Sequence, residues 1–163
     1  LETQVFLDCS ELKEVNLNEG LTMIEAKAFK NCEELMYVSI PSTVGVIGER
    51  AFYNCSELDE VQLPNGLQVI EKKAFENCSS LKNVSIPPTV TVIAEKTFRN
   101  CESLEKIEIP RTITRIDAHA FEWCEGLETC YVQFPHRAHL DAAVLHRRDL
   151  GGQANGLVQV SGL

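Results

Sequence analysis

Apolar and polar residues alternate along short stretches of the chain, and residues 35–40 show the pattern clearly. Val38 and Ile40 are apolar, and they alternate with Tyr37 and Ser39. Alternation with a period of two predicts a short strand with one buried face. The next residue is a proline, which ends the strand because it has no N–H to give to a sheet.

The residues after this strand complete a loop. Val44 and Ile47 return apolar side chains to the core, and Phe52 follows a small residue. A brief helical or 3-10 turn is predicted to end at Asn54 and Cys55, after which the same pattern starts again. Residues 35–57 therefore form one structural unit.

The unit recurs with a fixed step of 23 residues. The phenylalanine column contains Phe6, Phe29, Phe52, Phe75, Phe98 and Phe121, and the cysteine column contains Cys9, Cys32, Cys55, Cys78, Cys101 and Cys124. Leucine, isoleucine and proline columns keep the same step. A period of 20 to 29 residues is typical of a solenoid, in which one coil cannot bury its apolar face without its neighbours. Equivalent residues should stack about 4.7–4.9 Å apart.

These residues resemble the BspA-like branch of the leucine-rich repeats, whose pattern is L-x-x-V-x-I-P-x-x-V-x-x-I-x-x-x-A-F-x-x-C. The match covers roughly Leu1 to Val132. Asn18 replaces the first proline of the pattern, Gln133 the last, and Thr97 one of the alanines. The resemblance implies a leucine-rich-repeat solenoid. We expect a right-handed stack of coils with a parallel β-sheet on the concave face and short helical or 3-10 turns.

The period divides the chain into two regions. Residues 1–133 are predicted to be leucine-rich repeats, beginning with a partial unit, and residues 134–163 a non-repeat tail. Residues 139–150 could form an amphipathic helix that caps the last coil, and a linker or part of a following domain is the alternative. Because Leu1 falls in the middle of a unit, we expect further repeats upstream.

Length, composition and charge exclude some classes of function. The chain has 163 residues, a net charge of −9 and 44% hydrophobic residues, which is enough to bury a core. No apolar run is long enough to span a membrane. The acidic balance argues against a nucleic-acid partner, whose binding surface would be basic.

No catalytic motif is found, so the chain is predicted to be non-enzymatic and to need no cofactor. The best metal candidate is the set Cys124, Cys130, His136 and His139, but its spacing fits no common zinc pattern, and no metal site is predicted. The repeated cysteines are predicted to be reduced, buried thiols, because a small apolar side chain suits a regular column. N-x-S sequons occur at Asn54, Asn77 and Asn83 and are interpreted as chance.

Exposed strand positions give the candidate binding residues. They vary from unit to unit, whereas the core columns do not. The candidates are Tyr37, Ser39, Glu60, Gln62, Asn83, Ser85, Lys106, Glu108, Thr129 and Tyr131, preceded in the first unit by Glu14 and Asn16. Free drift of exposed positions would also produce such variation. A mixture of aromatic, amide and charged side chains would suit a protein or glycan partner.

A second exposed column is basic: Lys27, Arg50, Lys73, Lys96 and His119. It is interpreted as a solvated face whose charges are offset by neighbouring carboxylates, and a docking edge for an acidic partner is the alternative.

Two functions remain open. The resemblance implies a protein-binding or adhesion module, part of a longer protein at the cell surface or secreted. The alternative is a structural scaffold or spacer subunit of a larger assembly, which would also be compatible with an intracellular location. The first rests on analogy, because a fold does not determine a function.

Overall fold

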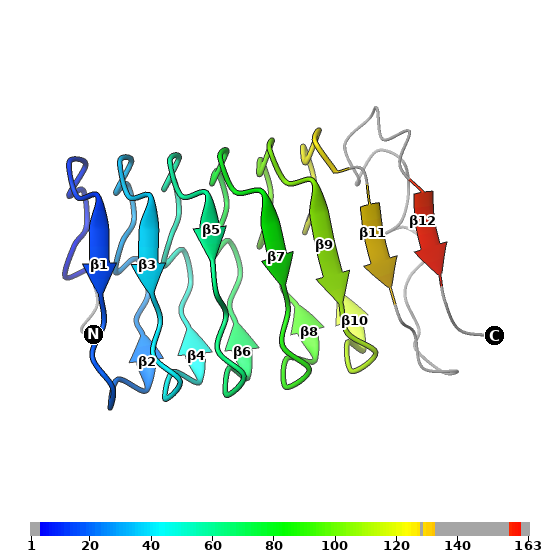
Figure 1. Cartoon of the computed structure of the whole chain (residues 1–163), viewed down its shortest axis with the longest axis horizontal. Coiled ribbons are helices and arrows are strands. Elements are labelled where there is room, and N and C mark those ends of the chain that lie inside the picture. The colour runs from blue at the N-terminus through cyan, green and yellow to red at the C-terminus, as the bar shows by residue number, and fades with distance from the viewer. Residues whose placement is uncertain (1–3, 128, 133–156, 161–163) are drawn as a thin grey trace.

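The computed structural model describes residues 4–127, 129–132 and 157–160, which form a row of similar coils (Figure 1). Most coils contribute one strand to a large sheet and one two-residue strand to a second layer. The large sheet is parallel, with the order β1-β3-β5-β7-β9-β11-β12. Its strands are β1 Glu14–Asn16, β3 Tyr37–Ser39, β5 Glu60–Val61, β7 Asn83–Ser85, β9 Lys106–Ile109, β11 Thr129–Val132 and β12 Leu157–Val160.

The register of this sheet follows the sequence period. Glu14 is aligned with Tyr37, and Tyr37 with Glu60, so each aligned pair is one repeat apart. Parallel strands joined through a complete coil are the arrangement predicted from the period, and the solenoid fold is confirmed. The packing of identical columns follows directly, because the same repeat position faces the core in every coil.

The short strands form a second layer that is interrupted once. Their bounds are β2 Met23–Ile24, β4 Val46–Ile47, β6 Val69–Ile70, β8 Val92–Ile93 and β10 Arg115–Ile116. The first three pair with one another, and β8 pairs with β10, but β6 and β8 are not joined as sheet partners.

Turns differ from expectation. No helix occurs among the described residues, and the predicted helical or 3-10 turns are replaced by hydrogen-bonded turns. The physical reason is that alternate amides in these turns donate to the next coil: Phe52 N donates to Ala74 O at 2.8 Å, and Asn54 N to Glu76 O at 2.9 Å. The amide between them, Tyr53 N, donates within its own coil to Arg50 O at 3.2 Å. Helical continuation would require donation to a carbonyl in the same coil.

Two positions in every coil have a left-handed backbone, with φ between 56° and 65°, which also prevents helical continuation. The first column is Gln4, Lys27, Arg50, Lys73, Lys96 and His119, and the second is Asp8, Asn31, Asn54, Asn77, Asn100 and Trp123.

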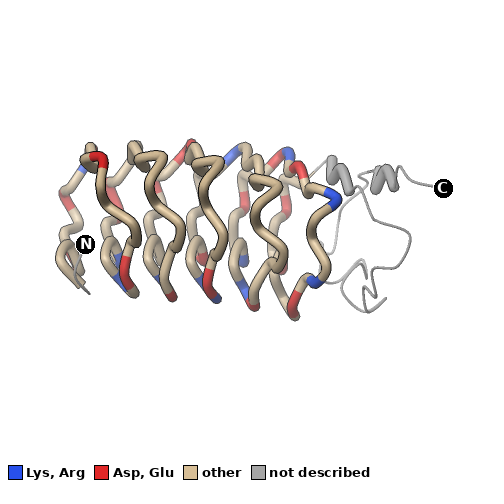
Figure 2. Tube along the Cα trace, turned by 90° about the horizontal axis from the view of Figure 1, so that it is seen from below, with Lys and Arg blue, Asp and Glu red and all other residues tan. Residues whose placement is uncertain are grey.

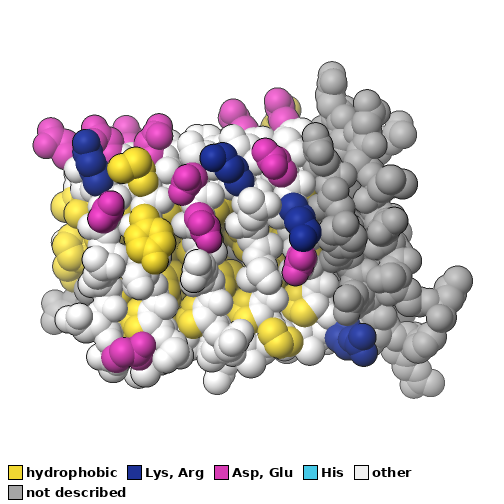
Figure 3. All heavy atoms as spheres, in the orientation of Figure 1, with side chains coloured by type: hydrophobic (Ala, Val, Ile, Leu, Met, Phe, Trp, Pro, Cys, Tyr) yellow, Lys and Arg dark blue, Asp and Glu magenta, His cyan; other side chains and the backbone are white. Residues whose placement is uncertain are grey.

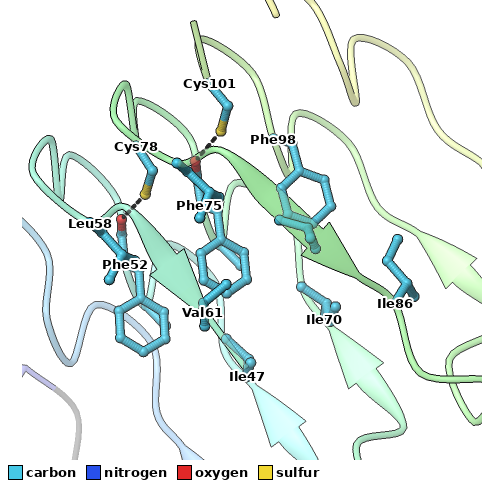
Figure 4. Packing of buried hydrophobic residues seen from close by; sticks show 14 of the residues in the cluster. Ile47, Phe52, Leu58, Val61, Ile70, Phe75, Cys78, Ile86, Phe98 and Cys101 are labelled. Carbon is cyan, nitrogen blue, oxygen red and sulfur yellow. Dashed lines mark hydrogen bonds between the residues drawn. The ribbon is translucent and has the colours of Figure 1, made fainter. Parts of the chain in front are cut away.

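The core is a set of continuous columns between the two layers (Figure 4). Neighbouring phenylalanine rings are stacked with centroids 5.1 to 5.7 Å apart and planes within 10° of parallel. Phe29, Phe52, Phe75 and Phe98 are fully buried. Burial of each large aromatic side chain contributes on the order of 1.5–3 kcal/mol, so the column is a principal source of stability.

The tail contributes one strand to the described structure. β12 pairs with β11 in parallel, with Thr129 aligned to Leu157. This pair is separated by more than one repeat, and the sequence pattern did not indicate the strand. The helix predicted at residues 139–150 lies outside the described residues, and the division at residue 133 stays a prediction.

Candidate binding surface

The outward face of the seven-stranded sheet, called here the sheet face, carries the predicted binding residues. It corresponds to the predicted concave face. Tyr37, Glu60, Asn83 and Lys106 are aligned across β3, β5, β7 and β9 and are all exposed. Gln62, Ser85 and Glu108 are also exposed, while Ser39 is half-buried.

The last two predicted residues, Thr129 and Tyr131, lie in β11. Their backbones are aligned with Lys106 and Glu108, so they continue the same two rows. The side chains of these two residues lie outside the described part of the structure.

A third exposed row lies beside these two and was missed by the sequence reasoning. It consists of the residues just before each strand: Lys13, Met36, Asp59, Lys82 and Glu105. Asp59 and Lys82 line the same groove as Glu60 and Asn83, so this row belongs to the sheet face. The available signal was variation at a fixed step, which these positions share with the predicted rows.

A shallow groove of about 700 Å³ crosses β5, β7 and β9. It brings together six of the predicted residues: Glu60, Gln62, Asn83, Ser85, Lys106 and Glu108. Tyr37 and Ser39 are not among its lining residues and lie on the next strand, β3.

Side chains within the groove contact one another. Lys106 Nζ lies 2.7 Å from Glu108 Oε1, and Gln62 Nε2 donates to Glu60 Oε1 at 3.3 Å. These contacts hold charged and amide groups at the surface, where a ligand can exchange them for contacts of its own. The groove offers hydrogen-bond donors, acceptors and both signs of charge.

No metal-binding group of three or more His, Cys, Asp or Glu side chains occurs among the described residues. Cys124, one of the four residues considered as zinc ligands, is buried, and its thiol donates to the carbonyl of Phe98 at 3.1 Å. The backbone of Cys130 lies in β11, but its side chain and the residues His136 and His139 lie outside the described part of the structure. Within that same part of the chain, no helix combines the length and apolar character needed to cross a membrane.

The buried cysteines are hydrogen-bonded, which the sequence reasoning did not foresee. Cys55, Cys78 and Cys101 each donate to the phenylalanine carbonyl 26 residues earlier, at 3.2 to 3.3 Å. Figure 4 shows the bonds of Cys78 and Cys101. Burial raises the pKa of Cys78 to about 12 and that of Cys32 to about 11. A thiol that holds its proton so firmly is a poor nucleophile, so this column serves packing rather than catalysis.

The basic column lies at the turns, where acidic and basic positions adjoin (Figure 2). Arg50 lies 3.1 Å from Glu49, and Lys96 lies 2.9 Å from Glu95. Such pairs are what a solvated face with offsetting carboxylates contains. A docking edge for an acidic partner stays a prediction.

The parallel sheet, the stacked core and the repeat-spaced surface rows define a leucine-rich-repeat solenoid. The family described as BspA type leucine rich repeat region matches residues 1–130 in six copies, and the chain belongs to this family. Leucine-rich repeats of this kind form protein-interaction modules and are typically non-enzymatic.

Similar solved structures are bacterial leucine-rich-repeat proteins. The T. pallidum protein TpLRR is 35% identical, with a TM-score of 0.70, over 73% of this chain and 58% of TpLRR. A leucine-rich repeat protein from Eubacterium ventriosum is 25% identical, with a TM-score of 0.62, over 74% of this chain and 32% of its own. The chain thus spans little more than half of the first of these proteins.

The pneumococcal vaccine antigen PcpA has the same fold, with a TM-score of 0.69 at 17% identity, over 93% of this chain and 42% of PcpA. The comparison with curated proteins gave no match.

Proposed function

We propose that this chain is a non-enzymatic protein-binding module that captures its partner on the sheet face. The observation that carries the proposal is the groove over β5, β7 and β9, which gathers six exposed residues from three coils. Its lining changes from coil to coil on a core that does not change. A rigid core with a variable surface is how repeat proteins adapt one scaffold to different partners.

The chemistry of the groove favours binding over catalysis. Its charged groups are exposed, and Lys106 and Glu108 pair with each other rather than converging with a nucleophile on one reacting atom. Exposed side chains that hydrogen-bond and carry both charges suit recognition of a polypeptide surface, and a glycan is the weaker alternative.

We further propose an adhesive role at the cell surface or in secreted form, as part of a longer protein. Membership of the BspA-type family supports the adhesive role. A longer parent protein is in keeping with the 58% of TpLRR that the chain covers. The alternative is a structural spacer in a larger assembly, for which the regular stack would suffice without a ligand.

A random peptide library displayed on phage tests the proposal with the full chain as bait. The triple variant Glu60→Ala, Gln62→Ala, Asn83→Ala removes groove side chains that are exposed. The control variant Gln68→Ala, Thr91→Ala, Arg115→Ala removes exposed side chains from the second layer. We expect enriched peptides to lose about tenfold or more in affinity with the first variant and little with the second, as for truncation of contact residues.

Circular dichroism should show the same spectrum for both variants and the parent chain. Peptides that bind the groove variant as tightly as the parent would contradict the proposal. A library that yields no binder at all would favour the spacer alternative.

A further inference from the structure

An exposed apolar pair, Met36 and Tyr37, lies on the sheet face at the second coil. Their exposed fractions are 44% and 41%, so they are two of the few large apolar side chains left open to water among the described residues. Exposed apolar groups on a rigid face are candidates for contact with a partner. In Figure 3, the hydrophobic side chains that protrude from the N-terminal half of this face have acidic side chains on both sides and one basic side chain beside them.

The sheet register sets Tyr37 between two carboxylates. Tyr37 is aligned with Glu14 on β1 and with Glu60 on β5, and both glutamates are exposed. Adjacent strands lie about 4.8 Å apart, so Glu14 is the direct neighbour of Tyr37 on one side and Glu60 is its neighbour on the other. A cation above the ring would therefore meet the electron-rich face of the ring and a carboxylate on either side.

The charge of this face is unevenly distributed. The exposed residues Glu11, Glu34 and Glu57, two positions before the third row, form the rim of the sheet face. The rim and sheet-face positions of the first three coils carry six carboxylates and one lysine: Glu11, Glu14, Glu34, Glu57, Asp59, Glu60 and Lys13. That lysine is already paired with Glu34 at 3.5 Å. The same positions of the next two coils carry two lysines and two glutamates, Lys82, Lys106, Glu105 and Glu108, so their charges balance. The acidic half of the face is thus centred on the Met36–Tyr37 pair.

The chain already uses one such contact elsewhere. Lys30 Nζ lies 5.7 Å from the centroid of the Tyr53 ring, on a different column of the coil. Tyr37 has no lysine or arginine aligned with it, because both of its cross-strand neighbours are glutamates. Lys13, the lysine nearest to the pair on this face, is engaged with Glu34, so the ring is open to a cation from a partner.

We infer that the Met36–Tyr37 pair docks a cationic segment of the protein partner, with an Arg or Lys side chain over Tyr37 between Glu14 and Glu60. Apolar side chains next to that cation pack on Met36. This inference rests on the proposed function, because it names the chemistry of the partner for the same face. It extends the contact surface beyond the groove, and Glu60 belongs both to the groove and to the site around Tyr37.

Binding of a short peptide of alternating Arg and Val to the full chain tests the inference, followed by fluorescence polarisation. Its counterpart with citrulline in place of Arg keeps the shape without the charge. We expect the citrulline peptide and the Tyr37→Ala variant each to lower affinity about three- to tenfold, the range of a cation–π contact. Tyr37→Phe keeps the ring and should stay within about twofold of the parent.

Two double variants separate local from general attraction. Glu14→Gln with Glu60→Gln removes the flanking carboxylates, whereas Glu102→Gln with Glu105→Gln removes the same charge from exposed positions near β9. We expect a loss of about tenfold or more for the first pair and less than about twofold for the second, because salt screens charges beyond about 10 Å.

The outcomes distinguish the inference from the proposed function. If the peptide binds the two double variants with equal affinity, its binding depends only on net charge, and the inference is wrong. If library peptides that respond to the groove variant carry no excess of Arg or Lys, the proposed function stands and the inference fails. If no peptide responds to any sheet-face variant, both fail. Self-association that Tyr37→Ala abolishes would make a second copy of this chain the occupant and would also overturn the inference.

Discussion

At the scale of single residues, the repeated cysteine combines two roles. From Cys32 to Cys124 its side chain is small and apolar enough for a buried column, and its thiol donates to a phenylalanine carbonyl of the preceding coil, whereas the first member, Cys9, is exposed. Alanine would fill less of the space and leave that carbonyl without its thiol donor. Serine would bury a more polar group at a greater desolvation cost. The sequence predicted the burial, but the hydrogen bond depends on how adjacent coils are offset.

Alkaline pH should reveal this burial. The pKa of Cys78 is raised from an ordinary 9.0 to about 12, so between these values the unfolded chain releases a proton that the folded chain retains. The free energy of unfolding therefore falls as pH rises above 9, by up to about 1.4 kcal/mol per pH unit for each such thiol. Cys78→Ala should reduce this slope by the share of one thiol, measured by urea unfolding from pH 8 to about 10, where Lys still holds most of its charge.

The exposed Cys9 provides the matched control, and Cys9→Ala should keep the parental slope. A slope that Cys78→Ala leaves unchanged would contradict the assignment. At neutral pH, Cys78→Ala should lower stability by about 1–2 kcal/mol through lost packing and a lost hydrogen bond.

The asparagine column shows what residue-level reasoning could not reach. Asn54 was placed at the end of a turn, and Asn54 and Asn77 were both noted as sequons, yet neither observation indicated the left-handed backbone that both have. Asparagine tolerates this conformation better than most residues. Asn100 also donates its amide to Asn77 Oδ1 at 2.9 Å, linking two coils. Trp123 takes the same conformation and is half exposed, which is unusual for a bulky residue.

At the scale of elements, the strands were predictable and the turns were not. Alternation around Val38 is a local signal, and so is the proline that follows the strand. The turn around Phe52 depends on carbonyls of the next coil, such as that of Ala74, and a single unit gives no sign of them. The candidate surface divides in the same way, since Asn83 and Gln62 were identified from strand alternation while Met36, just before its strand, was missed.

Close approach of neighbouring turns makes Gly48 the sharpest test at this scale. A Cβ atom there would lie 2.6 Å from the backbone nitrogen of Ala26 and 2.8 Å from the carbonyl carbon of Glu25. Because backbone atoms cannot move aside cheaply, Gly48→Ala should destabilise the chain by about 1–3 kcal/mol in thermal or urea unfolding.

Gly45 is the matched control for this substitution. A Cβ at Gly45 meets only the carbonyl oxygen of Thr22, at 3.9 Å, which is an ordinary contact. Gly45→Ala should therefore be neutral or stabilise by about 0.4–1 kcal/mol, through the lower entropy of the unfolded chain. Equal destabilisation by the two variants would show that the crowding at Gly48 is relieved by movement of the coil.

At the scale of the whole molecule, one number in the sequence determined most of the architecture. A step of 23 residues set the register of β1 through β11, because every coil places the same position opposite its neighbour. The period gave no indication of β12, whose alignment with β11 departs from it, nor of the interruption in the second layer. Both depend on how particular coils meet rather than on the average unit.

The second layer is interrupted between β6 and β8, and this opens one side of the junction between the two coils that contain these strands. Gln68, Thr91 and Thr114 occupy equivalent positions in successive coils. Gln68 N donates to Gly45 O at 2.9 Å, and Thr114 N donates to Thr91 O at 2.8 Å. The amide of Thr91 has no carbonyl partner among the described residues. A groove of about 560 Å³ lies at this point, while the other side of the junction stays closed through Phe75 N and Thr97 O at 2.9 Å. In native-state hydrogen exchange followed by NMR, Thr91 should therefore exchange at least about tenfold faster than Gln68 and Thr114, while Phe75 stays protected. Equal protection of all three second-layer amides would mean that the layer is continuous in solution and that the junction is no weaker than its neighbours.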